Sequence, residues 1–112
     1  VPAGPVTTAY TDFLLAHTLG DDYVVGVASV LPCFWLYAQV GAGLPEVPEG
    51  HPYALWLDTY RDPEFTKATS HTLSVVEKAF QQAGSAARAR AAHAYLTACR
   101  HELEFFDQAM RV

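Results

Sequence analysis

The longest apolar segment of the chain covers residues 23–45 and carries no charged side chain. Its length would suffice for a membrane-spanning helix, which needs about 20 apolar residues. Against a span, Pro32 lies at its centre and polar residues interrupt it. Its flanks, Asp22 and Glu46, are also acidic, whereas basic flanks are usual. We therefore predict a helix outside any membrane that other helices enclose, apolar on nearly every side.

The rest of the chain has the start signals, stop signals and apolar spacing of helices. Asp62-Pro63-Glu64 combines a side-chain cap, a proline at the first helical position and an acid in the first turn. Apolar residues then recur every three or four positions as far as Phe80, as on one helical face. Strand signals are nearly absent, so we predict an all-α protein. The expected elements are a helix from Thr7 or Thr8 to about Leu19, the apolar helix from Asp21 or Asp22 to the Gly41/Gly43 pair, a loop over 44–50, a short helix from Pro52, a helix from Asp62, and a last helix from Ala86 to about Met110 that Gly84-Ser85 precedes.

Composition and charge narrow the function classes. The chain has 112 residues, 51% of them hydrophobic and 17% charged, which indicates one folded domain. Its net charge is −5, and residues 1–60 contain no Lys or Arg, so nucleic-acid binding is disfavoured. Two cysteines are too few for a disulfide scaffold and fit reduced thiols in a cytoplasm.

Cys33 is the first candidate for chemistry. It follows Pro32, which removes a backbone N–H beside the thiol, and it shares a helix face with Tyr37 four positions later. A thiol with a phenol one turn away could be a nucleophile. Free cysteines are also among the most buried residues and are usually inert. Both interpretations stay open on spacing alone.

Glu102 is the second candidate. On a helix it shares a face with Phe105 and Phe106, and a carboxyl beside two aromatics is poorly solvated. Poor solvation favours the protonated form that a general acid needs. The alternative is a carboxylate that points to solvent, which is the role expected of Glu104.

Tyrosines and histidines are the remaining polar side chains of interest. The six tyrosines suit a flat heteroaromatic ligand, although helix packing explains aromatics equally well. The five histidines have no metal-ligand spacing among themselves or with Cys or acids, so we expect no metal or haem site.

These motifs together resemble the C-terminal half of the TenA family, the thiaminase II proteins of thiamin salvage. Four segments carry the resemblance in the family's order and spacing. They are AYTDFLL (9–15), LPCFWLY (31–37), HPYALWLDTY (51–60) and ELEFFDQAM (102–110). The second and third are specific, and the resemblance covers essentially the whole chain. Phe106 departs from the family's usual Trp, and Phe13 from the His of some members.

The resemblance implies a helical bundle of the haem-oxygenase-like type, with about five helices here, and hydrolysis of aminopyrimidines without a cofactor. The substrates would be 4-amino-5-aminomethyl-2-methylpyrimidine, converted to the hydroxymethylpyrimidine, and possibly thiamin. By motif position Cys33 matches the nucleophile and Glu102 the general acid. The residues that match positions around the pyrimidine or the nucleophile are Tyr10, Tyr37, Tyr60 and Phe105.

The resemblance also implies an incomplete domain. Family members are roughly twice this length, commonly form homo-tetramers in the cytoplasm, and supply an Asp and an aromatic to the pocket from a half that nothing here matches. We expect residues 1–112 to be a fragment of one domain, with a truncated gene as the alternative. Two other functions stay open: a non-catalytic helical partner or transcription-linked regulator, and an inactive truncated fragment. A regulator would not need to keep Cys33, Tyr37, Tyr60 and Glu102 together.

Overall fold

The computed structural model describes residues 2–43 and 48–108, which form five helices and no strand. The helices are α1 (Pro5–Gly20), α2 (Tyr23–Gly43), α3 (Ala54–Thr59), α4 (Pro63–Gln82) and α5 (Ser85–Asp107). The prediction of an all-α fold of the haem-oxygenase-like class is confirmed. Part of the predicted 44–50 loop (44–47), and Met110 at the expected end of the last helix, lie outside the described residues.

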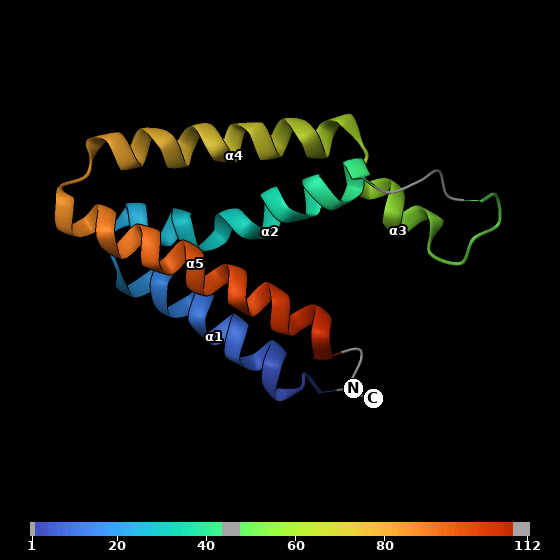
Figure 1. Ribbon diagram of the computed structural model, residues 1–112, viewed down its shortest axis with the longest axis horizontal. Helices are drawn as coiled ribbons and strands as arrows, with labels where there is room; N and C mark the ends of the chain where they lie inside the picture. The colour runs from blue at the N-terminus through green and yellow to red at the C-terminus, as the bar shows by residue number, and fades with distance from the viewer. Residues whose placement is uncertain (1, 44–47, 109–112) are drawn as a thin grey trace.

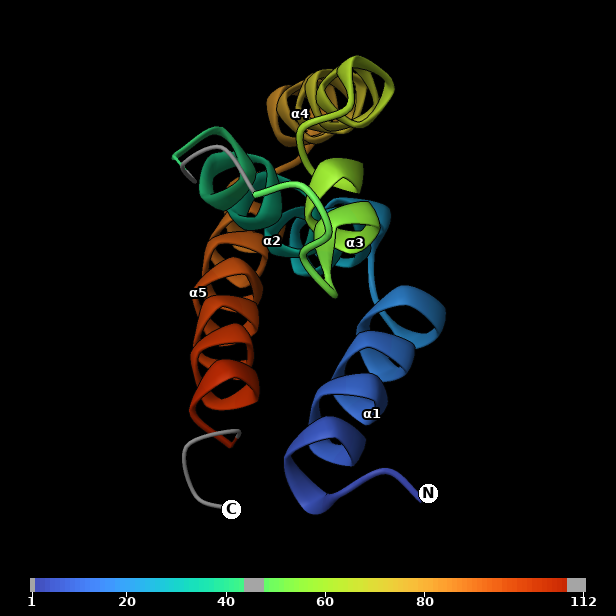
Figure 2. The same cartoon turned by 90° about the vertical axis from the view of Figure 1, so that its right-hand side faces the viewer.

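Helix α2 is the central element of the fold. It packs against α5, α4 and α1, and α1 also contacts α5. Figure 1 shows α4 along one side of α2, and α1 with α5 on the other side. In Figure 2 the short α3 lies near the end of α2, and α1 and α5 extend away from it. The start of α1 and the end of α5 therefore lie at the same end of the molecule.

The core where these helices meet is built from small side chains. Its buried members are Val24, Val25, Ala28, Ala79, Ala91 and Ala94, from α2, α4 and α5. Small residues let helix axes approach closely. The expectation that α2 is enclosed on nearly every side is wrong for its C-terminal half, where Trp35 is 36% and Val40 50% exposed. Helix α2 is long and apolar enough to cross a membrane by length and composition, but its packing on three helices is that of a core helix.

The helix termini follow the sequence signals with three corrections, the first of which is that the short helix α3 begins at Ala54 and not at Pro52. The Asp62 side chain accepts a hydrogen bond from the Glu64 backbone N–H at 2.8 Å, with Pro63 at the first position, as predicted. Helix α1 begins at Pro5 and not at Thr7 or Thr8, because proline is favourable in the first turn. Helix α5 has Gly84 at its N-cap, and Ser85 is already helical.

Ion pairs join the α1–α2 turn to α5. Arg90 forms an ion pair with Asp22, and the Arg90 Nε lies 3.7 Å from an Asp21 carboxylate oxygen. His17 lies 3.4 Å from the same Asp21 carboxylate. At the neighbouring turn, Arg88 donates to the Phe80 and Gln81 carbonyls at the end of α4. These contacts fix α1 and α4 relative to α5.

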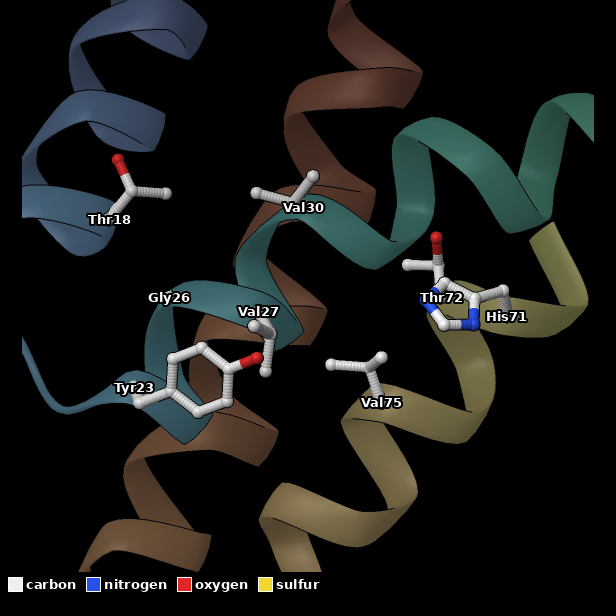
Figure 3. A pocket seen from close by; sticks show the side chains of 8 residues that line it. All are labelled: Thr18, Tyr23, Gly26, Val27, Val30, His71, Thr72 and Val75. Atoms are coloured by element: carbon white, nitrogen blue, oxygen red, sulfur yellow. The ribbon is translucent and has the colours of Figure 1, made fainter. Parts of the chain in front are cut away.

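The helix faces leave a large apolar surface uncovered. A cavity of ≈ 300 Å³ lies between α1, α2 and α4, and Figure 3 shows the valines of its lining between the Tyr23 ring on one side and His71 on the other. Nearby on α1, Leu15 is 57% and Leu19 82% exposed. The cavity is lined by Thr18, Tyr23, Gly26, Val27, Val30, His71, Thr72 and Val75. Soluble monomers rarely expose contiguous apolar patches above a few hundred Å².

We predict that the isolated 112-residue chain associates or aggregates in solution. Light scattering coupled to size exclusion should give a mass well above the 12.2 kDa of one chain. Replacing Leu15 and Leu19 with Lys should shift the distribution towards smaller species, because these changes remove exposed apolar surface. The same changes at the exposed Gln81 and Gln82 control for added charge. A monodisperse monomer of the unmodified chain would contradict the prediction.

Candidate active site

The hydroxyl of Tyr10 connects two side chains that lie far apart in the sequence. It lies 2.6 Å from Glu102 Oε1 and 3.0 Å from Cys33 Sγ. The three residues come from α1, α5 and α2, and Glu102 is only 3% exposed. We call this pair of hydrogen bonds the Tyr10 bridge. It brings three of the predicted site residues into direct contact.

The number of protons in the Tyr10 bridge determines which atom donates in each of its two hydrogen bonds. The Tyr10 O–H donates to Glu102 Oε1, which accepts. Tyr10 has one hydroxyl proton, and the Cys33 thiol must then donate to the Tyr10 oxygen. Burial, followed by its contacts with Cys33 and Glu102, raises the pKa of Tyr10 and keeps it a neutral phenol. In the Tyr10 bridge the thiol therefore donates to the phenol, and the phenol donates to the Glu102 carboxyl group.

The environment of Cys33 holds it as a thiol. Burial is the main cause that raises its pKa, and the nearby Glu102 carboxylate adds to the effect. When the thiol ionises, the Tyr10 hydroxyl donates to the thiolate sulfur, and this hydrogen bond acts in the opposite direction and lowers the pKa of the thiol. Any change that removes this hydrogen bond should make the Cys33 thiolate harder to form.

Glu102 keeps one oxygen available. Oε1 belongs to the Tyr10 bridge, whereas the buried Oε2 has no hydrogen-bond partner among the described residues. A buried carboxylate oxygen without a partner is unfavourable by about 1–3 kcal/mol or more. A polar group from a ligand would relieve that cost. Phe105 and Phe106, the expected neighbours of Glu102, stay 36% and 45% exposed. The polar contact of Glu102 comes from Tyr10.

An aromatic cluster lies next to the Tyr10 bridge. The Tyr37 ring lies 5.1 Å from that of Tyr60 and 5.6 Å from that of Phe106. Burial raises the pKa of Tyr37, and the nearby Glu102 carboxylate raises it further. The outer rings extend the cluster: Tyr60 contacts Trp56 and Phe65 edge-on, and Phe105 contacts Phe106. All the sequence-predicted site residues thus lie at the bridge or in this cluster.

Gly41 sets the position of Tyr60 and was not singled out as a site residue. A Cβ at Gly41 would lie 2.6 Å from the Tyr60 backbone oxygen and 2.9 Å from its Cβ. Only glycine allows α2 to approach this backbone so closely. The Gly-x-Gly at the end of the apolar helix was visible in the sequence, but its contact with Tyr60 was not.

Cys99 is not part of the Tyr10 bridge. Burial raises the pKa of its thiol, and Tyr95 is its hydrogen-bonding neighbour. Both cysteines are free. In the described part of the chain, His, Cys, Asp and Glu side chains form no group of three that could hold a metal ion.

The fold and the site define a helical domain of the haem-oxygenase-like class with a half-buried cysteine beside a buried tyrosine and a buried glutamate. Residues 2–112 match the TENA/THI-4/PQQC family, and the chain belongs to this family. The resemblance identified from the sequence motifs is thereby confirmed.

Named relatives fall into two groups. The thiamine biosynthesis multifunctional proteins ThiED of Corynebacterium glutamicum and Corynebacterium efficiens are 52% and 54% identical over 107 and 109 residues. These matches cover 95% and 96% of this chain but only 14% and 15% of the relatives. The aminopyrimidine aminohydrolase of Halalkalibacterium halodurans is 30% identical over 106 residues, 92% of this chain and 47% of the relative. That of Bacillus subtilis is 26% identical over 108 residues. The chain spans about half the length of these aminohydrolases.

Gly41→Ala should destabilise the protein by about 1–3 kcal/mol, because the added methyl group overlaps the Tyr60 backbone. Urea unfolding followed by circular dichroism measures the change. Gly43→Ala is the matched control on the same helix, since a Cβ there meets no atom within 4 Å. Equal losses in the two variants would show that the close approach is not what requires glycine at position 41.

Proposed function

We propose that the protein, with its complete domain, is a thiamin-salvage hydrolase that acts on aminopyrimidines. The observation that carries the proposal is the Tyr10 bridge, which joins a half-buried thiol to a buried carboxyl. Family membership and the names of the Bacillus subtilis and Halalkalibacterium halodurans relatives support the substrate class. The substrate would be 4-amino-5-aminomethyl-2-methylpyrimidine, and possibly thiamin itself.

The Tyr10 bridge supplies both a nucleophile and a proton. With the carboxyl protonated on its unpartnered Oε2, that proton passes to a ring nitrogen and makes the ring electrophilic. The Cys33 proton moves through Tyr10 to Oε1, and the sulfur bonds to a ring carbon. Glu102 ends this step as an acid again, so the protons balance.

The later steps reverse the addition. Glu102 donates its proton to the amine, which leaves the exocyclic methylene as ammonia. Water adds to the same carbon and returns a proton to Glu102. The sulfur is then expelled, which restores the aromatic ring; Cys33 regains a proton from Glu102 through Tyr10, and the ring nitrogen returns its proton to Glu102. These steps require no metal or organic cofactor.

The aromatic cluster suits the binding of a flat heterocycle. Tyr37 and Tyr60 offer ring faces and hydroxyls beside the Tyr10 bridge, and Phe105 lies at the exposed side of the cluster. Stacking would orient the ring, and the hydroxyls would select polar atoms at its edge. Tyr37, Tyr60 and Phe105 are the residues we assign to substrate binding.

The uncovered apolar faces suit the second half of a domain of the aminohydrolases' length. We assign residues 1–112 to one part of such a domain and propose that the complete domain assembles as a homo-tetramer in the cytoplasm. The second half would also provide the Asp and the aromatic that the pocket lacks here. Without them, we expect the 112-residue chain to hydrolyse aminopyrimidines weakly or not at all.

Cys33→Ser in the complete protein should lower turnover on the order of 100-fold or more, because a hydroxyl replaces the thiol that attacks the ring. A steady-state assay with the aminomethylpyrimidine measures the loss, and thermal melting should change little. Cys99→Ser is the control and should be nearly silent, since Cys99 has no part in the Tyr10 bridge. A Cys33→Ser variant that keeps most of its activity would refute the nucleophile assignment.

Glu102→Gln should lower kcat by about 100- to 10,000-fold with a modest change in KM. Glutamine keeps an oxygen for the Tyr10 hydroxyl but removes the acid. The matched control is Glu104→Gln, two positions along the same helix at an exposed side chain. The assignment fails if the two variants have the same activity.

A further inference from the structure

We propose that His101 is a positioning residue that holds the Tyr10 bridge in place. Its effect on turnover rests on the proposed function, but its effect on the Cys33 thiol does not. No role for His101 was predicted from the sequence, and the proposed mechanism does not use it.

The His101 imidazole stacks on the ring of Tyr10. The two ring centroids are 5.3 Å apart, and the planes differ by only 6°. His101 also contacts the ring of Phe13, at 4.9 Å. Tyr10 and Phe13 lie one turn apart on α1, so a single half-buried side chain of α5 packs against both.

Helix α5 therefore contacts Tyr10 at two points through consecutive residues. Glu102 accepts a hydrogen bond from the hydroxyl, and His101 packs on the ring. The hydroxyl has to satisfy two distances at once, 2.6 Å to oxygen and 3.0 Å to sulfur. Hydrogen bonds weaken steeply as distance and angle depart from their optimum. A ring free to tilt would keep the bond to the carboxylate, which is charge-assisted, and weaken the bond to sulfur.

The test is the rate at which iodoacetamide alkylates Cys33 in the full-length protein, measured by mass spectrometry that separates Cys33 from Cys99. Tyr10→Phe should slow alkylation roughly three- to tenfold, because the hydrogen bond that lowers the pKa of the thiol is lost. His101→Ala should slow it by about threefold, and His101→Phe, which retains a stacked ring, should restore the rate. His93→Ala, at an exposed site on the same helix, should have no effect.

The double variant distinguishes positioning from a general loss of structure. If His101 acts through the Tyr10 hydroxyl, His101→Ala should have no further effect in the Tyr10→Phe background. Equal slowing by His101→Ala in both backgrounds would refute the proposal. Faster or unchanged alkylation when His101→Ala is the only substitution would also refute it. If His101→Ala melts below the assay temperature, His101→Leu, which fills the space without a planar ring, takes its place with the same expectations.

Steady-state kinetics on the same variants test the link to the proposed function. His101→Ala should lower kcat with KM unchanged and should have no further effect on kcat after Tyr10→Phe. Alkylation that responds as expected in a protein without hydrolase activity would refute the proposed function alone. Active protein with an unaltered Cys33 alkylation rate would refute the positioning role alone.

Discussion

The hydrogen bond between Tyr10 and Glu102 is the interaction on which the site depends. It joins residues 92 positions apart and satisfies one oxygen of a carboxyl that is almost fully buried. Burying such a group without a partner would cost about 1–3 kcal/mol or more. The same hydroxyl also reaches the Cys33 sulfur. The contact that makes the buried carboxyl tolerable is therefore also the contact that adjusts the thiol.

The helix packing that surrounds this bond explains why it can be so short. At one end of α1, ion pairs of Arg90 with Asp21 and Asp22 connect the α1–α2 turn to α5. Next to that turn, Gly26 lets α2 approach α1 so closely that a Cβ would lie 3.1 Å from the His17 carbonyl oxygen. The Tyr10 bridge holds the same helix at its middle. Helix α1 is thus fixed at two levels by helical elements, which position side chains more rigidly than loops do.

Much of the fold and of the site's membership could be predicted from the sequence. Helix starts and apolar spacing are local signals, so Asp62-Pro63-Glu64 and the uncharged 23–45 segment predicted helices correctly. Cys33 and Tyr37 lie one turn apart, and this pairing also follows from helical geometry. The contact between Tyr10 and Glu102 does not follow from helical geometry, because no local sequence signal relates the first helix to the last. The family motifs identified both residues, but only the packing showed that they share a hydrogen bond.

The contacts that the sequence did not predict are those in which a residue acts through its neighbour across a helix interface. Gly41 matters because of where the Tyr60 backbone lies, and His101 because its imidazole faces α1. A glycine in an apolar helix and a histidine beside an acid have many ordinary explanations, so their type alone carries little information. Their contacts depend on how closely two separate helical elements approach each other, which no local sequence pattern indicates. The residues predicted for chemistry were those with reactive side chains, whereas the contacts of Gly41 and His101 emerged only from the three-dimensional structure.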